Sequence, residues 1–310
     1  MDFQTTIKKK FTLSGPGLHT GVVTRTTVCP ADASTGIRFC RTDLHPSVIV
    51  PALADYVTDT NHGTTIAKGS ASVSTIEHLM SALHGMQIDN AIVEIDGPEV
   101  PILDGSARLW VEQIVASGVQ RLNAGRQYVT LAEPLEWSNS ETGVVMRAFP
   151  SDSLQIECNI QFKSQLIGSQ SASFGSYASY ADAIAPCRTF VFLHEVEFLL
   201  SKGLIRGGDL DNALVFVDKP VSEDSMNRLT ALFNKDRSEI QVRDGLLNTV
   251  KPYFPNEPAR HKLLDFIGDI YLVGSPVKAR FELLCPGHYA NSRLANLIRQ
   301  SVEKNKKLCY

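Results

Sequence analysis

The chain has 310 residues, which is longer than most single domains and favours two domains of ordinary size. Its net charge of −3 and its pI of about 6.2 argue against nucleic acid or an anionic membrane surface as an obligatory partner. No apolar run approaches the ~18 residues of a transmembrane helix, so we expect no stable membrane insertion.

The cysteines are scattered, and no two of them form a CxxC pair. This pattern favours reduced thiols over a disulfide framework or a cysteine zinc site. The basic cluster Lys8–Lys10 is not followed by the apolar core of a signal peptide. We therefore expect a cytoplasmic protein. The sequence leaves the oligomeric state open, and a monomer is our working expectation.

The first part of the chain predicts strands, with turns that carry histidines. Strands are expected within 3–29, with a break at Ser14–Gly17, and further ones at 36–40, 47–50, 64–67 and 89–96. His19 lies between Gly17 and Gly21, where glycines let the backbone approach another group closely. His62 lies on a similar turn. A single histidine in a turn is more often structural, so neither establishes a site by itself.

The next segment predicts a helix that presents two functional side chains. Apolar residues recur at i, i+3, i+4 and i+7 from Ile76, and Gly85 is a natural C-terminal stop. Glu77 and His78 point away from this apolar stripe. The alternative for Glu77 is structural, because Ser74 and Glu77 have the spacing of a capping box.

The middle of the chain repeats the order of strands followed by helices. The expected elements are a helix at 107–117, a linker near Asn123–Gly125, strands at 127–131, 143–149, 154–162 and 277–284, and a loop or surface strand at 169–179. A strand, a helix ending at Gly203 and a second strand predict a small βαβ unit at about 191–217. Residues 222–257 show no clear period.

The stretch 259–269 predicts a helix with one apolar and one polar face. His261, Asp265 and Asp269 are spaced i, i+4 and i+8, so they share the polar face. A histidine and a carboxylate four residues apart on a helix can bind the same metal ion. The alternative is an amphipathic helix with a solvated polar face.

His78, His261 and Asp265 together would supply two imidazoles and a carboxylate. Hydrolytic zinc sites commonly use three protein ligands and leave one position for water, whose pKa falls to ~7. We therefore predict Zn²⁺ at these residues, and Fe²⁺ could compete for such a ligand set.

The remaining polar candidates complete a set for amide hydrolysis. Glu77, next to a predicted ligand, is placed as a general base. His288, at a helix start after Pro-Gly, could protonate the leaving amine, and Asp269 could hold its other ring nitrogen. Lys262 and the hydroxyl of Thr189 could stabilise the developing oxyanion.

Several motifs resemble one known family in their order and spacing. They are Ser-Thr-Ile-Glu-His-Leu at 74–79, Pro-Ile-Leu-Asp-Gly-Ser at 101–106, Cys-Arg-Thr-Phe at 187–190, His-Lys-Leu-Leu-Asp-x-Ile-Gly-Asp at 261–269, Gly-His at 287–288 and Gly-Leu-His-Thr-Gly at 17–21. From about residue 4 to 300 the chain resembles the bacterial UDP-3-O-acyl-N-acetylglucosamine deacetylases. These enzymes perform the committed step of lipid A biosynthesis.

The resemblance implies an α+β fold of two similar domains, each a sheet layered against helices, with the active site between them. We place the domains at 1–124 and 125–310, with the βαβ insert at about 191–217 in the second. The implied substrate is UDP-3-O-acyl-N-acetylglucosamine. Residues 219–257 form a longer segment than in the enterobacterial members, so their role is open.

The resemblance assigns the same roles to the metal, base, acid and oxyanion residues named above. It also implies a uridine contact at Phe190 and an acyl passage in the insert. The full set of expected substrate contacts is Phe190, Leu18, His19, Val191, Leu193, Val196, His62 and Gly287.

Two other functions fit parts of the pattern. One is a zinc amidohydrolase of the same fold that acts on another acylated amino sugar. The other is a protein with structural zinc, although such sites are usually closed, four-ligand and rich in cysteine.

Overall fold

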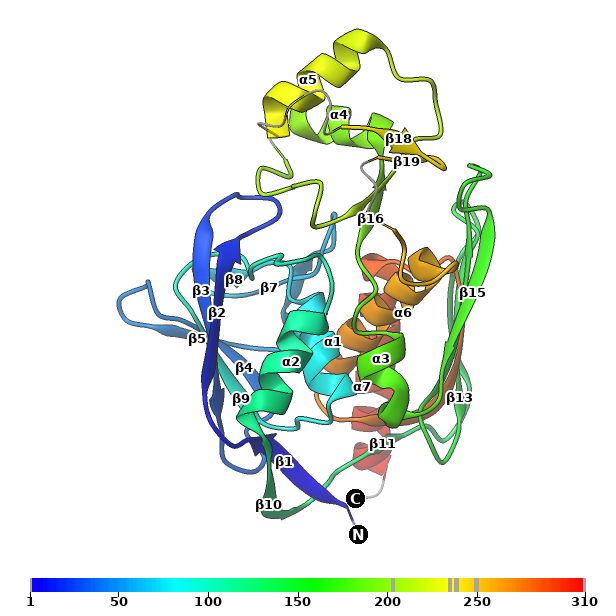
Figure 1. The fold of residues 1–310 in the computed structure, drawn as a ribbon. Helices are drawn as coiled ribbons and strands as arrows, with labels where there is room; N and C mark the ends of the chain where they lie inside the picture. The colour runs from blue at the N-terminus through cyan, green and yellow to red at the C-terminus, as the bar shows by residue number, and fades with distance from the viewer. Residues whose placement is uncertain (1, 202–203, 234–235, 237–239, 248–250, 309–310) are drawn as a thin grey trace.

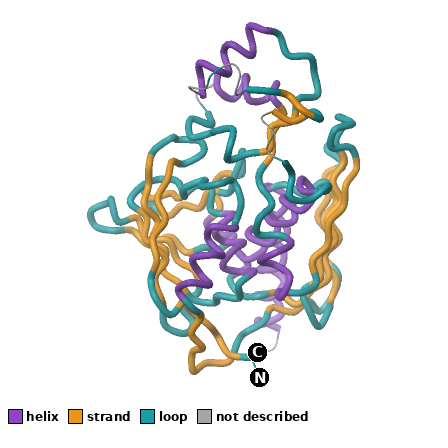
Figure 2. Tube along the Cα trace, in the orientation of Figure 1, coloured by secondary structure: helices purple, strands orange, loops and turns teal. Residues whose placement is uncertain are grey.

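In the computed structural model, two β-sheets enclose a layer of helices between them (Figures 1 and 2). The structure describes residues 2–201, 204–233, 236, 240–247 and 251–308. Both termini lie at the same end of the molecule, and the insert projects from the opposite end. This arrangement confirms the α+β class expected from the sequence.

The sheet of the first half has the strand order β2-β3-β9-β4-β5. Its central strand β9 runs antiparallel to β3 and parallel to β4. A small sheet of order β6-β7-β8 follows β5 in the chain. The elements are β1 (Phe3–Ile7), β2 (Phe11–Pro16), β3 (Val23–Pro30), β4 (Ile37–Arg41), β5 (Val48–Pro51), β6 (Val57–Asp59), β7 (Thr65–Lys68), β8 (Ala71–Val73), α1 (Glu77–Gly85), β9 (Ala91–Ile95) and α2 (Arg108–Ser117).

The second half repeats this topology. Its sheet has the order β12-β13-β20-β14-β15, and β20 runs antiparallel to β13 and parallel to β14, as β9 does with its neighbours. The elements are β10 (Val119–Gly125), β11 (Val129–Thr130), β12 (Leu135–Asn139), β13 (Val144–Pro150), β14 (Gln155–Gln161), β15 (Ser169–Phe174), α3 (Tyr180–Ala183), α6 (Glu257–Ile270), β20 (Val277–Leu284) and α7 (His288–Leu308). Helix α6 thus occupies the place of α1, and α7 that of α2, so the two halves are alike.

The insert stands between β15 and α6, at the place in the second half where β6–β8 stand in the first. Strands β16 (Phe190–Phe192) and β17 (Leu214–Phe216) pair in parallel around α4 (Leu193–Ser201), which confirms the predicted βαβ unit. The sheet continues to β19 (Leu246–Leu247) and β18 (Val242–Arg243). Gly203, the predicted end of the helix, lies outside the described residues.

Helices α1 and α6 cross at the centre of the molecule, and Gly268 permits their close approach. A Cβ added at Gly268 would lie 2.1 Å from the backbone oxygen of Glu77, which no side chain could tolerate without a shift of the helices. The outer sheets supply the rest of the core, because alternate side chains along their strands face the helices. In β20, every second residue is buried against the helices. The crossing of α1 and α6 therefore brings the polar faces of both helices together.

Several local predictions were wrong. The expected linker at 123–125 is the end of β10, which pairs with β1 at the start of the chain. The break expected at Ser14–Gly17 comes later, because β2 continues to Pro16. Within 222–257, which showed no period, the structure contains α5 (Glu223–Phe233), whose Met226 and Leu229 are buried in the insert. These contacts are made with residues distant in the sequence, so a local pattern does not reveal them.

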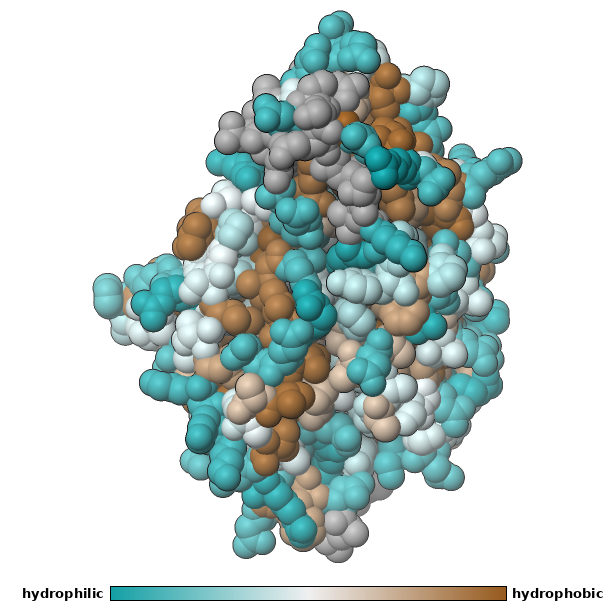
Figure 3. All heavy atoms as spheres, viewed as in Figure 1, coloured by the Kyte–Doolittle hydropathy of each residue, from teal (hydrophilic) through white to brown (hydrophobic). Residues whose placement is uncertain are grey.

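On the face shown in Figure 3, hydrophilic side chains cover much of the periphery, and hydrophobic ones gather beside the insert at the top. Large exposed apolar side chains of the described residues include Phe198 on α4 and Val242 on β18. Among the described residues, no helix is long and apolar enough to cross a membrane.

Candidate metal and catalytic site

The predicted metal ligands meet where α1 and α6 cross. The potential ligand atoms of His78, His261 and Asp265 all lie within 4.8 Å of one another, and the three residues are buried. Asp265 Oδ1 lies 3.3 Å from Nε2 of His261 and 3.7 Å from Nε2 of His78. Within the described part of the chain, this is the one group of His, Cys, Asp or Glu with such a geometry.

Neighbouring groups hold the ligands in binding-competent states. Nδ1 of His261 lies 3.0 Å from the carbonyl oxygen of Cys187, which it reaches as a donor, so Nε2 carries the free lone pair. Burial lowers the pKa of His261 to about 3, so its ring is neutral. Burial alone would raise the pKa of Asp265, but the ammonium of Lys262, which donates to it, holds that pKa well below its usual range.

Asp265 Oδ1 is buried and has no hydrogen-bond partner among the described residues. Its other oxygen, Oδ2, accepts from Nζ of Lys262 at 3.1 Å. A buried carboxylate oxygen without a partner is costly unless a cation satisfies it. Two imidazoles and one carboxylate are a ligand set that suits zinc or ferrous iron. The residues present therefore fit a divalent metal ion.

Glu77 begins α1 beside this cluster, and the capping-box interpretation is wrong. The N-cap position is Ile76, and no side chain caps the helix. Instead, Glu77 Oε2 accepts a hydrogen bond of 2.9 Å from the backbone N–H of Thr64. Burial raises the pKa of Glu77, which makes its carboxylate a stronger base.

His288 begins α7 and is paired with Asp269 from α6. Its Nδ1 donates to Asp269 Oδ2 at 3.0 Å, and the side-chain amide of Asn291 donates to the same oxygen at 2.8 Å. The hydroxyl of Thr64 donates to Asp269 Oδ1 at 2.6 Å. Burial opposes a charge on His288, but Asp269 outweighs it and raises the pKa to about 9. His288 is therefore an imidazolium at neutral pH.

Thr189 and Phe190 lie where the insert leaves the second half. The backbone of Thr189 donates to Gly105 of the first half and accepts from Leu214 of the insert, each at 2.8 Å. Nζ of Lys262 lies 5.7 Å from the centre of the Phe190 ring. Burial would lower the pKa of Lys262, but Asp265 raises it, so the side chain is cationic.

A cavity of about 220 Å³ opens onto the metal cluster. It brings together most of the predicted site residues, namely Leu18, His19, His62, Glu77, His78, Thr189, Phe190, Val191, Val196, His261, Lys262, Asp265 and His288. Leu193 is packed inside the insert instead, with Val196 and Leu210. Gly287 and Asp269 do not line the cavity, and Asp269 reaches it through His288.

Sequence reasoning missed several residues of this region. Thr64 and Asn291 hold Asp269, yet neither belongs to a pattern that predicts such contacts. Further cavity residues are Thr75 and Ile102 of the first half and, in the insert, Leu199, Ile205, Gly208, Asp209, Asn212, Ala213 and Val215. The signals for this part of the site were the turn at His62, the motifs at 74–79 and 101–106, which contain Thr75 and Ile102, and the predicted insert at 191–217.

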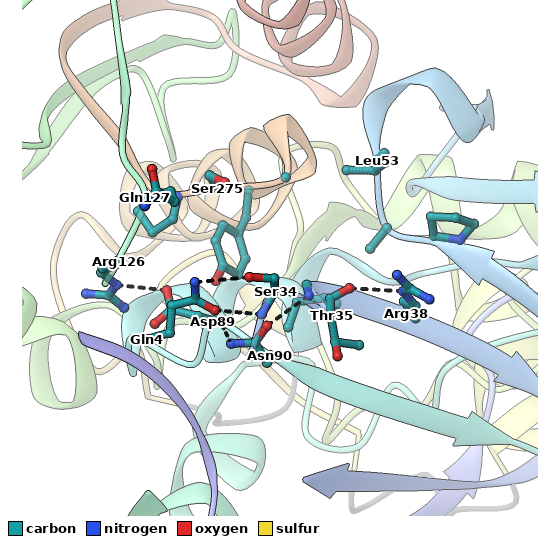
Figure 4. A pocket seen from close by; sticks show the side chains of 17 residues that line it. Gln4, Ser34, Thr35, Arg38, Leu53, Asp89, Asn90, Arg126, Gln127 and Ser275 are labelled. Carbon is teal, nitrogen blue, oxygen red and sulfur yellow. Dashed lines mark hydrogen bonds and ion pairs between the residues drawn. The ribbon is translucent and has the colours of Figure 1, made fainter. Parts of the chain in front are cut away.

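A second cavity, of about 350 Å³, lies between the two halves away from the metal cluster (Figure 4). Its polar side chains bond to one another. Gln4 Oε1 accepts from the backbone of Ser34 at 2.8 Å and from Asn90 at 3.0 Å, and Arg126 pairs with Asp89 at 2.8 Å. Because these polar groups already have hydrogen-bond partners, we interpret this cavity as a gap in the packing between the two halves. Its volume is nevertheless larger than that of the cavity at the metal cluster.

Fold and site together define an α+β protein of two like halves, with a buried pair of histidines, an aspartate and an adjacent glutamate where the halves meet. The profile of the LpxC family, UDP-3-O-acyl N-acetylglycosamine deacetylase, matches residues 4–233 and 234–300. The chain therefore belongs to this family.

Individual relatives agree with this assignment. The chain is 40% identical to the bifunctional enzyme LpxC/FabZ of Porphyromonas gingivalis over 99% of its own length and 66% of the relative's. It is 38% identical to the UDP-3-O-acyl-N-acetylglucosamine deacetylase of Phenylobacterium zucineum over 96% of the chain and 93% of the relative. The deacetylase of Chlamydia felis is 37% identical over 97% of the chain and 98% of the relative. The chain thus spans just under two thirds of the bifunctional relatives and nearly all of the deacetylases.

Proposed function

We propose that this protein hydrolyses the N-acetyl group of UDP-3-O-acyl-N-acetylglucosamine, releases acetate and so catalyses the committed step of lipid A biosynthesis. The observation that carries the proposal is the unpartnered Asp265 Oδ1 between two histidines, in a cavity that also holds Glu77 and His288. The names of the deacetylase relatives supply the substrate.

His78, His261 and Asp265 would hold the metal ion, which we propose to be zinc, with ferrous iron as a competitor in the cell. A zinc ion bound there would act as a Lewis acid and lower the pKa of a coordinated water to about 7. The roles of the surrounding residues follow from their own chemistry.

Glu77 accepts a proton from the attacking water as the oxygen of that water bonds to the acetyl carbon. The raised pKa of this buried carboxylate brings it closer to the working pH of a general base. The N–H of Thr64 holds one oxygen of Glu77, which fixes the orientation of the carboxylate in the cavity.

His288 then donates its proton to the amide nitrogen as the C–N bond breaks, so the products are acetate and the free amine. Asp269 keeps His288 protonated and oriented until that step. The ammonium of Lys262 and the hydroxyl of Thr189 border the same cavity and would stabilise negative charge on the acetyl oxygen.

The acyl chain would lie along the insert. Val191, Val196, Leu199, Ile205 and Val215 give the cavity an apolar wall there. Each buried CH₂ contributes about 0.8 kcal/mol, so binding should weaken as the chain is shortened.

Acetate release tests the proposal directly. The chelated protein and the zinc-reloaded protein are each given UDP-3-O-acyl-N-acetylglucosamine and the same sugar without the 3-O-acyl group. We expect release only by the reloaded protein, and mainly from the acylated sugar. Activity on the unacylated sugar alone would favour another amidohydrolase. Tight zinc without any hydrolysis would favour a structural metal.

A further inference from the structure

Glu99 is a buried carboxylate outside the catalytic set, in the loop between β9 and α2. Its relative exposure is 0%. Its Oε1 accepts from the backbone N–H of His19 at 2.9 Å and from the hydroxyl of Thr75 at 2.8 Å. Its Oε2 accepts from the backbone N–H and the hydroxyl of Thr20, at 2.8 and 2.7 Å. Among the described residues, no ion pair reaches this carboxylate.

These bonds hold the turn Gly17–Gly21 against Glu99. A Cβ at Gly17 would lie 2.4 Å from Glu99 Oε2, so only glycine allows this approach. The insert also packs closely against the turn, since a Cβ at Gly207 would lie 2.2 Å from the carbonyl oxygen of Gly17. Gly17 thus lets the turn approach the carboxylate, and Gly207 lets the insert approach the turn.

The same turn forms one wall of the cavity above the metal cluster. Leu18 and His19 line that cavity. The carbonyl oxygen of Leu18 accepts from the N–H of Gly207 at 3.0 Å, which ties the turn to the insert beside Ile205. Nε2 of His19 lies 3.0 Å from the carbonyl oxygen of His62, another residue of the cavity. Any displacement of the turn would therefore reshape this wall.

We propose that Glu99 is a positioning residue that fixes the turn Gly17–Gly21, and through it the cavity wall next to the insert, for substrate binding. This inference rests on the proposed function in one respect, that the cavity binds the substrate. The position of the turn itself does not depend on it.

Each oxygen of Glu99 faces a backbone N–H, so the side chain must accept a hydrogen bond at both oxygens. A backbone N–H can only donate, whereas a hydroxyl can reverse its role. In Glu99→Gln, the side-chain NH₂ would therefore oppose either His19 N–H or Thr20 N–H in both orientations of the amide. The substitution keeps the shape of the side chain and removes its function as a double acceptor.

Thr24→Val is a matched control. The hydroxyl of Thr24 donates to the backbone oxygen of Glu99 at 2.8 Å and is also fully buried. Valine has the same shape as threonine, so this variant removes a buried hydrogen bond to Glu99 but leaves the carboxylate network intact. Both variants are compared for zinc content, thermal stability, amide hydrogen exchange and steady-state kinetics.

We expect the amides of His19 and Thr20 to exchange at least about tenfold faster in Glu99→Gln than in the wild type, and to be unchanged in Thr24→Val. For the zinc-loaded enzyme, we expect KM to rise about tenfold in Glu99→Gln with kcat altered less than about threefold. Zinc content should stay the same in both variants, because Glu99 contacts none of the proposed ligands.

Unchanged exchange at His19 and Thr20 in Glu99→Gln would overturn the proposal. Faster exchange with an unchanged KM would overturn the part that concerns the cavity wall. A lower kcat with unchanged KM, accompanied by a loss of zinc, would also overturn the proposal. Glu99 would then act on helix α1 through Thr75, which precedes that helix, and not on the cavity wall. If the wild type releases no acetate, the proposed function fails, and the exchange measurement still decides whether Glu99 fixes the turn.

Discussion

The pair of His288 and Asp269 gives the sharpest prediction, because the structure sets both its sign and its size. The side chains are 13% and 1% exposed, and Nδ1 of His288 donates to Asp269 Oδ2 at 3.0 Å. Burial alone would lower the pKa of His288, but Asp269 raises it from 6.5 to about 9. That difference corresponds to about 3 kcal/mol in favour of the imidazolium.

Asp269→Asn preserves the shape of the side chain and removes its charge. Nothing from residue 269 then opposes the lowering of the His288 pKa by burial. The pKa of His288 should then fall to about 6.5 or below. At pH 8 the protonated fraction would drop from about 90% to about 3%. If His288 is the general acid, kcat/KM at pH 8 should fall about thirtyfold or more, and the basic limb of the pH profile should move from about 9 toward 6.5.

The assay is the pH dependence of kcat/KM from pH 5 to 10, with zinc content measured on each sample. Asn291→Ala is the control, since it removes a donor to the same Asp269 oxygen but leaves the charge. Its basic limb should remain near 9. A limb near 9 in Asp269→Asn would refute the reasoning, because another group would then be the acid.

The same pair affects folding stability with a defined sign. The folded pKa of His288 lies above 6.5, so its interaction stabilises the protein fully below pH 6.5 and is lost as the pH rises through about 9. Urea unfolding of the wild type should show a loss of stability in this window that Asp269→Asn lacks. If the free energy of unfolding changed with pH in the same way in both proteins, the assigned pairing of His288 with Asp269 would be contradicted.

The other predictions concern the metal, the base, the helix crossing and the insert. Chelation, or His78→Ala, should remove the metal and abolish turnover while the circular dichroism of the fold persists, and activity without metal would contradict the site. Glu77→Gln should cost about 10²–10⁴ in kcat with zinc retained, and near-normal turnover would rule out a base at this position. Gly268→Ala should destabilise the protein by about 1–3 kcal/mol or more in urea unfolding, because its Cβ would lie 2.1 Å from the Glu77 carbonyl oxygen, and an unchanged midpoint would contradict the close crossing. Val196→Phe should lower kcat/KM for long-chain substrates more than for truncated ones, whereas Leu193→Ala, in the same apolar cluster but off the cavity, should lower stability without altering chain preference. Equal losses on both substrates in Val196→Phe would leave the passage without support.

The sequence by itself determined the helices that carry the chemistry. Helix α1 and helix α6 have regular apolar stripes, so their polar faces, with His78 on one and His261 and Asp265 on the other, follow from the 3.6-residue period. The start of α7 at His288 also followed from local signals, since Pro-Gly precedes it. Motif order along the chain was enough to indicate the family.

The tertiary structure decided what local patterns cannot contain. The likeness of the two halves rests on strand order, and the pairing of β1 with β10 joins residues more than a hundred positions apart. The roles of Thr64 and Glu99 exist only through contacts with distant groups, because a buried carboxylate finds its donors wherever the fold places them. The crossing at Gly268 is the physical reason that the polar faces of two separately predicted helices form one site.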